Sequence, residues 1–248
     1  MIRTKLCIAA AAMALIQPAP LLADKAQDAV AAESRTDADR ALDAGRQPTE
    51  VLRFSGIEAG QSVADFMAGD GYYTAMIADL VGPGGVVYAV NPVRFHNPEV
   101  WKQRLAAHTN IRTMAVPPRA MQLAPGSVDT IFAHLVFHDL YWESERYEFP
   151  RLDVDGVLAN WFAAIRPGGQ VIVVDHMGPA GDPREVTGRL HRIASDTVIA
   201  AMTGAGFRLT ERSDMLRRSE DDHSHNVFDE EVRGKTDRFV MKFQKPGG

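Results

Sequence analysis

One segment constrains the fold more than any other, residues 62–74, with the sequence SVADFMAGDGYYT. It begins as an apolar strand that contains one acidic residue, Asp65. A turn with Gly69 and Gly71 follows, and an apolar helix begins near Tyr73. Glycines let a backbone approach a ligand closely, and the start of a helix presents unpaired N–H groups. The segment therefore predicts a nucleotide-type binding turn at the end of a buried strand.

The rest of the chain alternates short apolar runs with amphipathic helical patterns. A short helix is predicted to start at Pro48 and to stop at Gly56. Longer helices are predicted at residues 73–81, 97–108, 154–165 and 186–202. Strands are predicted at residues 62–67, 86–90, 111–116, 128–133, 170–175, 207–212 and 238–244. Such alternation is typical of an α/β fold with a doubly wound, mostly parallel sheet.

The first 23 residues have the pattern of a secretory signal peptide. Arg3 and Lys5 form a basic start, residues 6–16 are apolar, and Ala23 is a small residue suited to cleavage. The apolar run of about 11 residues is too short to cross a bilayer comfortably, although an uncleaved anchor is the alternative. We therefore expect a periplasmic or secreted protein with no stable membrane span after cleavage.

Composition excludes several kinds of function. The single cysteine, Cys7, lies in the signal sequence, so the exported chain would have no disulfide, thiolate metal site or cysteine nucleophile. The net charge of −5 argues against nucleic acid as the main partner. Residues 24–47 are polar and alanine-rich, which predicts a solvated, partly helical lead-in. Residues 48–246 are long enough for one α/β domain.

Four pieces of the chain occur in an order known from one enzyme family. They are the turn at residues 68–71, the turn at 82–85 before the second strand, the entry at 126–129 to the fourth, and the Ile-Arg-Pro-Gly-Gly turn at 165–169 before the fifth. On these residues the chain resembles the class I S-adenosylmethionine-dependent methyltransferases from Pro48 to Pro246. The turn before the fifth strand is the most specific of the four.

The chain is still more similar to a bacterial group of predicted exported methyltransferases. The motifs that carry this likeness are residues 68–74, Phe137-His138-Asp139, Val174-Asp175-His176, Asp222-His223 and residues 233–237. The resemblance implies a Rossmann-like sheet of seven strands, of which the last is antiparallel. It also implies S-adenosylmethionine as the cofactor, bound across the carboxyl edge of the strands.

The resemblance assigns cofactor contacts to the first turn and to the end of the second strand. These residues are Asp65, Ala68, Gly69, Asp70, Gly71, Tyr72 and Asn91. Gly69 and Gly71 would let the backbone pass close to the methionine part. Asp65 would orient the turn, or the ammonium group of the cofactor through water. The alternative is a Rossmann-like turn that serves packing only.

Two positions depart from the family pattern. Met67 replaces the first glycine of the turn, so we expect a narrower pocket. Asn91 replaces the acidic residue that binds both ribose hydroxyls. An amide accepts a hydrogen bond from one hydroxyl but lacks the two-acceptor, charged grip of a carboxylate. We therefore expect lower affinity for the cofactor, or a different ligand.

Two His–Asp pairs follow neighbouring strands of the predicted sheet. His138 and Asp139 come after the fourth strand, and Asp175 and His176 end the fifth. Both pairs should open on the same cleft. An imidazole held by a carboxylate is suited to taking a proton from an oxygen or nitrogen nucleophile. We predict His138 or His176 as the base, with Asp139 and Asp175 orienting them; the alternative is that each pair caps a loop or helix start.

Other polar and aromatic residues have simpler interpretations. His191 and Arg192 should lie on a solvated helix face rather than in the cleft. Residues 221–225 should form an exposed polar loop, and we assign no metal site to them. A third group would form either a lid over a substrate or ordinary packing. It consists of Tyr141, Trp142, Tyr147 and Phe149.

These observations favour an exported methyltransferase that moves a methyl group from S-adenosylmethionine to an oxygen, nitrogen or carbon atom of a small molecule. Two alternatives use the same cleft. In one, the His–Asp pairs perform hydrolysis or elimination, with or without a metal. In the other, the chain keeps the fold and binds a small ligand without catalysis.

Overall fold

The computed structural model describes residues 24–247. The predicted signal sequence, with Cys7, lies outside these residues. The helices are α1 Lys25–Ala31, α2 Asp37–Arg40, α3 Asp43–Arg46, α4 Pro48–Ser55, α5 Tyr72–Val81, α6 Pro98–Ala107, α7 Val154–Ala164, α8 Pro183–Leu190 and α9 Ser195–Gly204. Three short 3-10 turns are η1 Val93–Phe95, η2 Pro118–Ala120 and η3 His138–Tyr141. The strands are β1 Ser62–Phe66, β2 Val86–Pro92, β3 Ile111–Val116, β4 Val128–His134, β5 Ile165–His176, β6 Arg208–Ser213 and β7 Arg238–Gln244.

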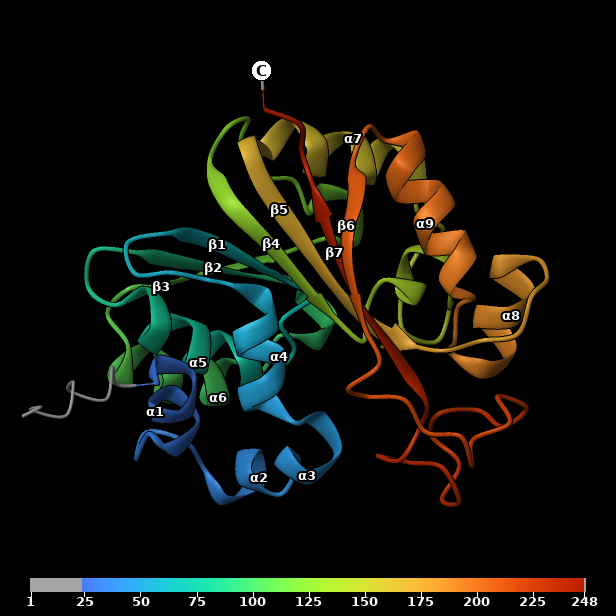
Figure 1. The fold of residues 1–248 in the computed structure, drawn as a ribbon, viewed down its shortest axis with the longest axis horizontal. Helices are drawn as coiled ribbons and strands as arrows, with labels where there is room; N and C mark the ends of the chain where they lie inside the picture. Colours follow the sequence, from blue (N-terminus) through green and yellow to red (C-terminus); the bar gives the residue numbers. More distant parts are fainter. Residues whose placement is uncertain (1–23, 248) are drawn as a thin grey trace, which may run out of the picture.

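The strands form one seven-stranded sheet in the order β3-β2-β1-β4-β5-β7-β6 (Figure 1). Strands β1 to β5 pair in parallel, and β7 is antiparallel to both β5 and β6. This confirms the predicted Rossmann-like sheet with an antiparallel last strand. Strand β5 begins earlier than predicted, because Ile165 already pairs with Val128 before the register shifts at Thr130.

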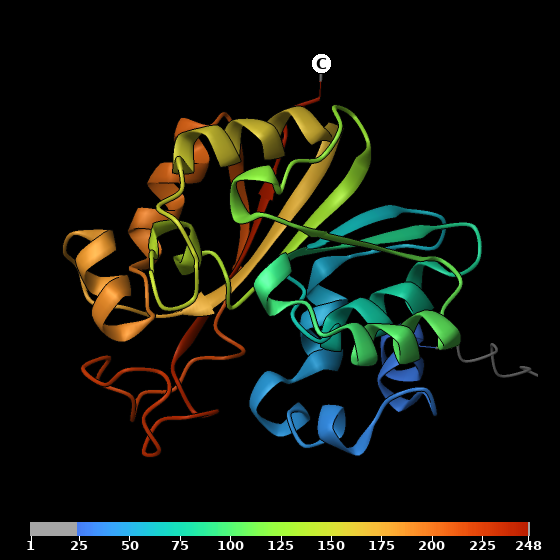
Figure 2. The same cartoon turned by 180° about the vertical axis from the view of Figure 1, so that it is seen from behind.

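Helices cover both faces of the sheet (Figures 1 and 2). Helices α7 and α9 contribute Trp161 and Met202 to the core on one face, whereas α1, α4, α5 and α6 build the core on the other. Because strand side chains alternate, Val173 of β5 enters the first core and Ile172 the second. The central strands of the sheet are buried on both faces, which explains why their sequences are nearly continuous runs of apolar residues.

The carboxyl ends of β1, β2, β4 and β5 lie along the same edge of the sheet because these strands run in parallel. At two of these ends the chain turns with a left-handed backbone. Met67 after β1 has φ 53° and Leu135 after β4 has φ 59°. Such angles are uncommon for residues other than glycine, and strained backbone of this kind clusters at functional sites. This edge of the sheet is therefore the expected position of a ligand site.

The predicted helix at residues 186–202 is wrong as one element, because it is broken into α8 and α9. His191 ends α8 with a left-handed backbone, φ 50°. Arg192 is then fully buried in an ion pair with Asp221, whose Oδ2 lies 2.8 Å from its Nη1. Ile193 pairs with Met177 beyond β5. The buried ion pair and the pairing of Ile193 with Met177 favour a break over one continuous helix. Arg192 therefore does not lie on a solvated face.

The lead-in at residues 24–47 is partly helical, as predicted, but it packs on the domain instead of being solvated throughout. Ala26 and Ala29 of α1 are buried against α4 and α5. Arg35 and Asp39 are also buried. Within residues 24–247, no helix combines the length and the hydropathy needed for a membrane span.

Candidate functional site

Asp65 lies beneath the glycine turn at the end of β1. Its carboxylate accepts a hydrogen bond from the Thr74 hydroxyl on α5. The side chain is buried, and burial raises the pKa of Asp65 to about 7 against the opposing effects of Thr74 and Arg46. The predicted contact residue Asp65 is therefore poised between its neutral and charged forms near neutral pH.

The turn above Asp65 presents backbone to open space. Gly69 has φ 57°, and a Cβ atom added there would meet no atom within 4 Å. Gly71 has φ 77° and caps the start of α5. A Cβ atom on Gly71 would approach the Trp101 ring to 2.9 Å. Gly69 therefore faces a cavity, whereas Gly71 is required for packing.

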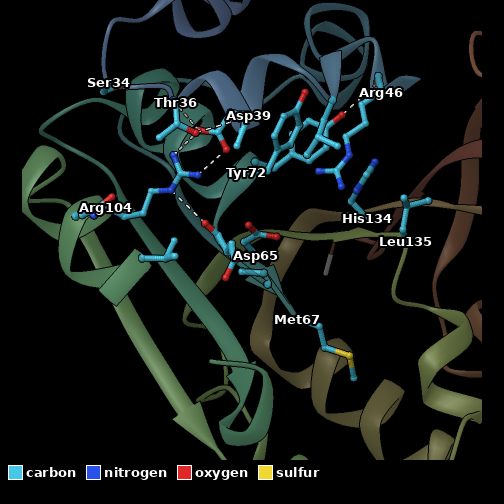
Figure 3. Close-up of a pocket in the computed structure, with 18 of the residues that line it drawn as sticks. Ser34, Thr36, Asp39, Arg46, Asp65, Met67, Tyr72, Arg104, His134 and Leu135 are labelled. Atoms are coloured by element: carbon cyan, nitrogen blue, oxygen red, sulfur yellow. Dashed lines mark hydrogen bonds and ion pairs between the residues drawn. The ribbon is translucent and has the colours of Figure 1, made fainter. Parts of the chain in front are cut away.

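A first cavity of about 620 Å³ opens beside this turn (Figure 3). Its walls come from the glycine turn, the lead-in, α6 and the end of β4. Asp65 and Arg46 place opposite charges in it. The Arg46 guanidinium lies 4.4 Å from the centre of the Tyr72 ring, and no hydrogen bond or ion pair from residues 24–247 engages it. The cavity is thus equipped to take a ligand with both an anionic and a cationic group.

His134 adds a buried imidazole to the first cavity. Burial, together with Arg46 and Arg238, lowers its pKa well below the usual value, so the ring is neutral. Its Nε2 atom is buried and has no hydrogen-bond partner among residues 24–247. The ring centre lies 4.5 Å from that of Tyr73. A buried polar atom without a partner is costly, so His134 favours a ligand that satisfies it.

The lead-in is held over this cavity by charged contacts. Arg104 of α6 binds Asp39 with both terminal nitrogens, at 2.8 and 2.6 Å, and its Nε donates to the Asp70 carbonyl at 3.1 Å. The Tyr72 hydroxyl donates to Asp43 at 2.7 Å. Two predicted cofactor residues, Asp70 and Tyr72, therefore also fasten the lead-in to the site. Ala68 lines the same cavity.

Asn91 also has a structural role. Its side chain is fully buried at the end of β2. Its Oδ1 accepts a hydrogen bond from the Gly69 N–H at 2.9 Å, and its Nδ2 donates to the Gly69 carbonyl at 3.0 Å. Each end of the amide holds one backbone partner, so in this structure Asn91 braces the glycine turn, and its contact with ribose hydroxyls stays a prediction.

A second cavity of about 610 Å³ lies on the other side of Met67, Gly69 and Leu135, which line both cavities. Aromatic side chains dominate its wall. They are Phe95, Trp142, Tyr147, Phe149 and Phe228. Three of the predicted lid residues are therefore cavity walls, whereas Tyr141 packs against Phe137 with 6.5 Å between ring centres. Met67 lines both cavities and packs against the core of one face, and it fills neither cavity.

The predicted catalytic residues meet at the inner end of the second cavity. His138, Asp139 and His176 line it, and Asp175 lies fully buried behind them. His138 Nδ1 lies 2.7 Å from Asp175 Oδ1, and its Nε2 lies 3.4 Å from Asp139 Oδ1. Burial disfavours the charged ring, but the two carboxylates outweigh it and raise the pKa of His138 to about 9. His138 is therefore a cation at neutral pH.

The partnership of Asp175 differs from the prediction. Its carboxylate binds the His138 ring and accepts from the backbone N–H groups of His138 and His176, at 2.8 and 2.7 Å. It does not bind the ring of its neighbour in sequence. The His176 Nδ1 atom instead lies 2.7 Å from the Thr236 hydroxyl. The pairing of β4 with β5 brings Asp175 next to His138, which lies 37 residues earlier in the sequence. The adjacent His and Asp residues of each pair indicated no such partner.

His176 is neutral, in contrast to His138. Burial, Arg238, His138 and Arg192 together lower its pKa well below the usual value. The ring centres of His138 and His176 lie 5.8 Å apart. His191 completes the group at 5.7 Å from His138, and burial followed by the His138 charge lowers its pKa to about 4. A charged and a neutral imidazole side by side can act as a hydrogen-bond donor and a proton acceptor.

Sequence reasoning missed several site residues. Arg46, His134, Leu135 and Thr236 were not singled out, and His191 was expected on a solvated helix face. His134 and Leu135 carried a usable signal, because they directly follow a buried strand at the edge where ligands bind.

The polar loop at residues 221–225 forms a structural network. Asp221 pairs with Arg192, and His223 Nε2 lies 2.9 Å from Asp237 Oδ2. In the described part of the chain, no group of three or more His, Cys, Asp or Glu side chains has the arrangement of a metal site. Asp221 is buried, so the loop is not fully exposed as predicted.

Comparison with known proteins identifies structural neighbours that share the fold of this chain. No family model and no curated protein matches the sequence. Among solved structures, a SAM-dependent methyltransferase from Aquifex aeolicus is 21% identical, with a TM-score of 0.53, covering 79% of this chain and 87% of that one. An S-adenosylmethionine-dependent methyltransferase from Mesorhizobium loti is 14% identical, with a TM-score of 0.57, covering 82% and 100%.

A third neighbour was solved with ligands. It is the Burkholderia thailandensis 1,6-didemethyltoxoflavin-N1-methyltransferase with 1,6-didemethyltoxoflavin and S-adenosylhomocysteine, 16% identical, with a TM-score of 0.53, covering 90% of this chain and 84% of that one. All three resemble this chain in fold at low sequence identity. By its sheet order and by these likenesses, the chain has the Rossmann-like fold of the class I S-adenosylmethionine-dependent methyltransferases.

Proposed function

We propose that this protein is an S-adenosylmethionine-dependent methyltransferase acting on a small molecule, at an oxygen, nitrogen or carbon atom. The observation that carries the proposal is the pair of cavities that share Met67, Gly69 and Leu135 at the carboxyl edge of a methyltransferase fold. One cavity has the charges for the amino-acid end of the cofactor. The other has acid–base groups for an acceptor. The Burkholderia thailandensis neighbour, solved with a small molecule and S-adenosylhomocysteine, supports this division.

The first cavity fits the methionine part of the cofactor. Arg46 would bind its carboxylate, and Asp65 would bind its ammonium group, each as a charge-assisted hydrogen bond. The unpartnered Nε2 of His134 would gain a hydrogen bond. Gly69 would allow close approach of the backbone, since no side chain fills the space there.

In the proposed reaction the protein mainly positions its two ligands. When bound, S-adenosylmethionine supplies an electrophilic methyl group. His138 would donate a hydrogen bond to the acceptor, and neutral His176 would accept a hydrogen bond from it. Asp175 would keep His138 charged and oriented. Alignment of the acceptor with the methyl group is the larger contribution, because methyl transfer requires an in-line approach.

Calorimetry on the purified protein tests the proposal. S-adenosylmethionine should bind with a Kd of about 1–100 μM. Arg46→Ala and Asp65→Asn should each weaken binding about tenfold or more, because each removes one charged partner. Arg189→Ala, an exposed arginine on α8, is the matched control and should leave binding unchanged. Gly71 is unsuited to this test, since a side chain there would strike Trp101.

Other results would contradict the proposal. A folded protein that gives no heat with S-adenosylmethionine, but gives heat with a divalent metal, would favour a hydrolase or lyase. Binding without any methyl transfer would favour a ligand-binding protein.

We also propose that the chain is exported to the periplasm or secreted. The support is the basic start at Arg3 and Lys5, the apolar run after it, and the small residue Ala23. Cell fractionation followed by N-terminal sequencing should find a product that starts at Asp24. Leu15→Arg should block processing, because it places a charge in the apolar run, whereas Glu33→Arg should not. An unprocessed cytoplasmic product from the unaltered chain would contradict export.

A further inference from the structure

We infer that the acceptor in the second cavity is a flat, conjugated molecule with an acidic hydroxyl, a phenol or an enol, and that this hydroxyl oxygen receives the methyl group. The inference rests on the proposed methyltransferase function, and it narrows the acceptor from any small molecule to one chemical class. Three features of the cavity support it: its aromatic wall, the gathering of its polar groups at one end, and the sign of the charge at that end.

The wall of the second cavity is suited to flat rings. Trp142 lies 5.2 Å from Phe149 and 5.8 Å from Tyr147, measured between ring centres, and Phe95 lies 6.0 Å from Tyr147. At the outer rim Phe228 is 58% exposed and packs 5.0 Å from His191. Aromatic side chains at these spacings bind a conjugated ligand through stacked or edge contacts. A sugar or a charged amino acid would find few partners on this wall.

Two of the polar side chains, His138 and His176, form the buried inner end of the cavity, and His191 lies between them and the aromatic wall. His138 comes from the turn after β4, His176 from the end of β5, and His191 from the break between α8 and α9. Among residues 24–247, no hydrogen bond occupies His176 Nε2, and the buried His191 Nδ1 has no partner. A ligand that fits must therefore be apolar along its body and polar at its inner tip.

The charge at the inner end favours a hydroxyl over an amine. Arg238 lies behind His176, and its Nε donates to Thr236 at 3.1 Å. The cation His138 stands beside His176, and Arg192 is nearby. The two carboxylates, Asp175 and Asp139, face His138. Cations that disfavour a charged His176 also disfavour an ammonium group beside it, and they stabilise an oxyanion there.

The proposed step balances with the groups present. A lone pair on the hydroxyl oxygen forms the new C–O bond to the methyl carbon. S-adenosylmethionine, when bound, would supply this methyl group and would keep the electron pair of its C–S bond as a neutral thioether. The hydroxyl proton leaves to solvent before the transfer, because the cations that keep His176 neutral also lower the pKa of the bound hydroxyl. His138 stabilises the oxygen as it loses its proton.

Binding of 4-nitrophenol to the cofactor-free protein tests the inference without relying on activity. The phenolate form absorbs visible light, so the protonation state of the bound compound can be read directly. We expect the pKa of bound 4-nitrophenol to fall by about one unit, because the cations at the inner end favour its anion. We also expect 4-nitroaniline and 4-nitroanisole, which have similar rings, to bind about tenfold more weakly.

Variants separate the two parts of the cavity. Trp142→Leu should weaken all three compounds alike, because it removes aromatic wall. His176→Leu removes the polar ring at the inner end of the cavity, so it should weaken 4-nitrophenol about tenfold and leave 4-nitroanisole unchanged. His225→Gln, an exposed histidine in the C-terminal loop, is the matched control and should change nothing.

Equal binding of the three compounds, an unshifted pKa for bound 4-nitrophenol, or no binding would each overturn the inference. Calorimetry with S-adenosylmethionine distinguishes this failure from failure of the proposed function. Cofactor binding without selective 4-nitrophenol binding overturns the acceptor class only. Selective binding of 4-nitrophenol without binding of S-adenosylmethionine would support the phenol site and contradict the proposed methyltransferase function.

Discussion

Asp65 shows how one buried carboxyl group sets a pH dependence. Burial raises its pKa from 3.8 to about 7, so between these values the folded protein holds a proton that the unfolded chain has released. The unfolded state then binds fewer protons than the folded state, and stability falls as pH rises from about 4 to 7. Above pH 7 the whole cost is present, because the folded protein then carries a buried anion.

Asp65→Asn should therefore stabilise the protein at pH 8 and have little effect at pH 5. Each pKa unit corresponds to about 1.4 kcal/mol, so the gain at pH 8 has an upper limit of about 4 kcal/mol. Urea unfolding of both proteins at the two pH values measures it. Parallel pH curves would show that Asp65 is not the group responsible. The same variant should lose affinity for S-adenosylmethionine, which would separate stability from function.

At the scale of elements, the lead-in depends on one buried ion pair. Arg104 of α6 and Asp39 of α2 are both buried and bind each other through two hydrogen bonds. Removing one partner of such a pair leaves the other charge buried without compensation, at a cost of about 3–5 kcal/mol.

Arg104→Gln should therefore destabilise the protein by about 3 kcal/mol and expose residues 32–47 to limited proteolysis. The double variant Asp39→Asn with Arg104→Gln should cost less than the sum of the single variants, since the double variant leaves no unpaired charge. Arg112→Gln, an exposed arginine on β3, serves as the control. Additive effects, measured by urea unfolding, would show that the two residues do not stabilise the lead-in as a pair.

Strands were easier to predict than helix ends or side-chain partners. Residues 111–116 and 238–244 match β3 and β7, because each is a short segment rich in apolar residues and bounded by turn signals. The break at His191 was missed because its cause, the buried pair of Arg192 with Asp221, joins residues that are far apart in sequence. The bond of Asp175 to the His138 ring was missed for the same reason, since strand pairing creates it.

For the molecule as a whole, the lead-in connects two elements that are far apart in the sequence, α5 and β7. The Gly45 carbonyl on α3 accepts a hydrogen bond from Arg238 of β7 at 2.8 Å, whereas Asp43 of the same helix binds Tyr72 of α5. The first and last parts of the domain are therefore tied through residues 24–47. The sequence indicated the order of the elements, but it did not reveal this closure of the domain by the lead-in. A polar, alanine-rich segment contains no run of apolar residues from which its packing could be predicted.

This closure predicts that the domain unfolds as one unit. Trp101 on α6 and Trp161 on α7 report on opposite faces of the sheet. In two single-tryptophan proteins made with Trp→Phe changes, fluorescence should give the same urea midpoint for both reporters. Two separate midpoints would show that the halves unfold independently.

Met67 and Leu135 together restrict which side chains this site can tolerate in the course of evolution. Both have a left-handed backbone, a conformation that β-branched residues strongly disfavour. Valine, isoleucine and threonine are therefore poor replacements, and the acceptable variants are glycine, asparagine and a few unbranched side chains. Both side chains line the two cavities, so replacement of either by glycine, which this backbone accepts freely, is the change most able to enlarge the site.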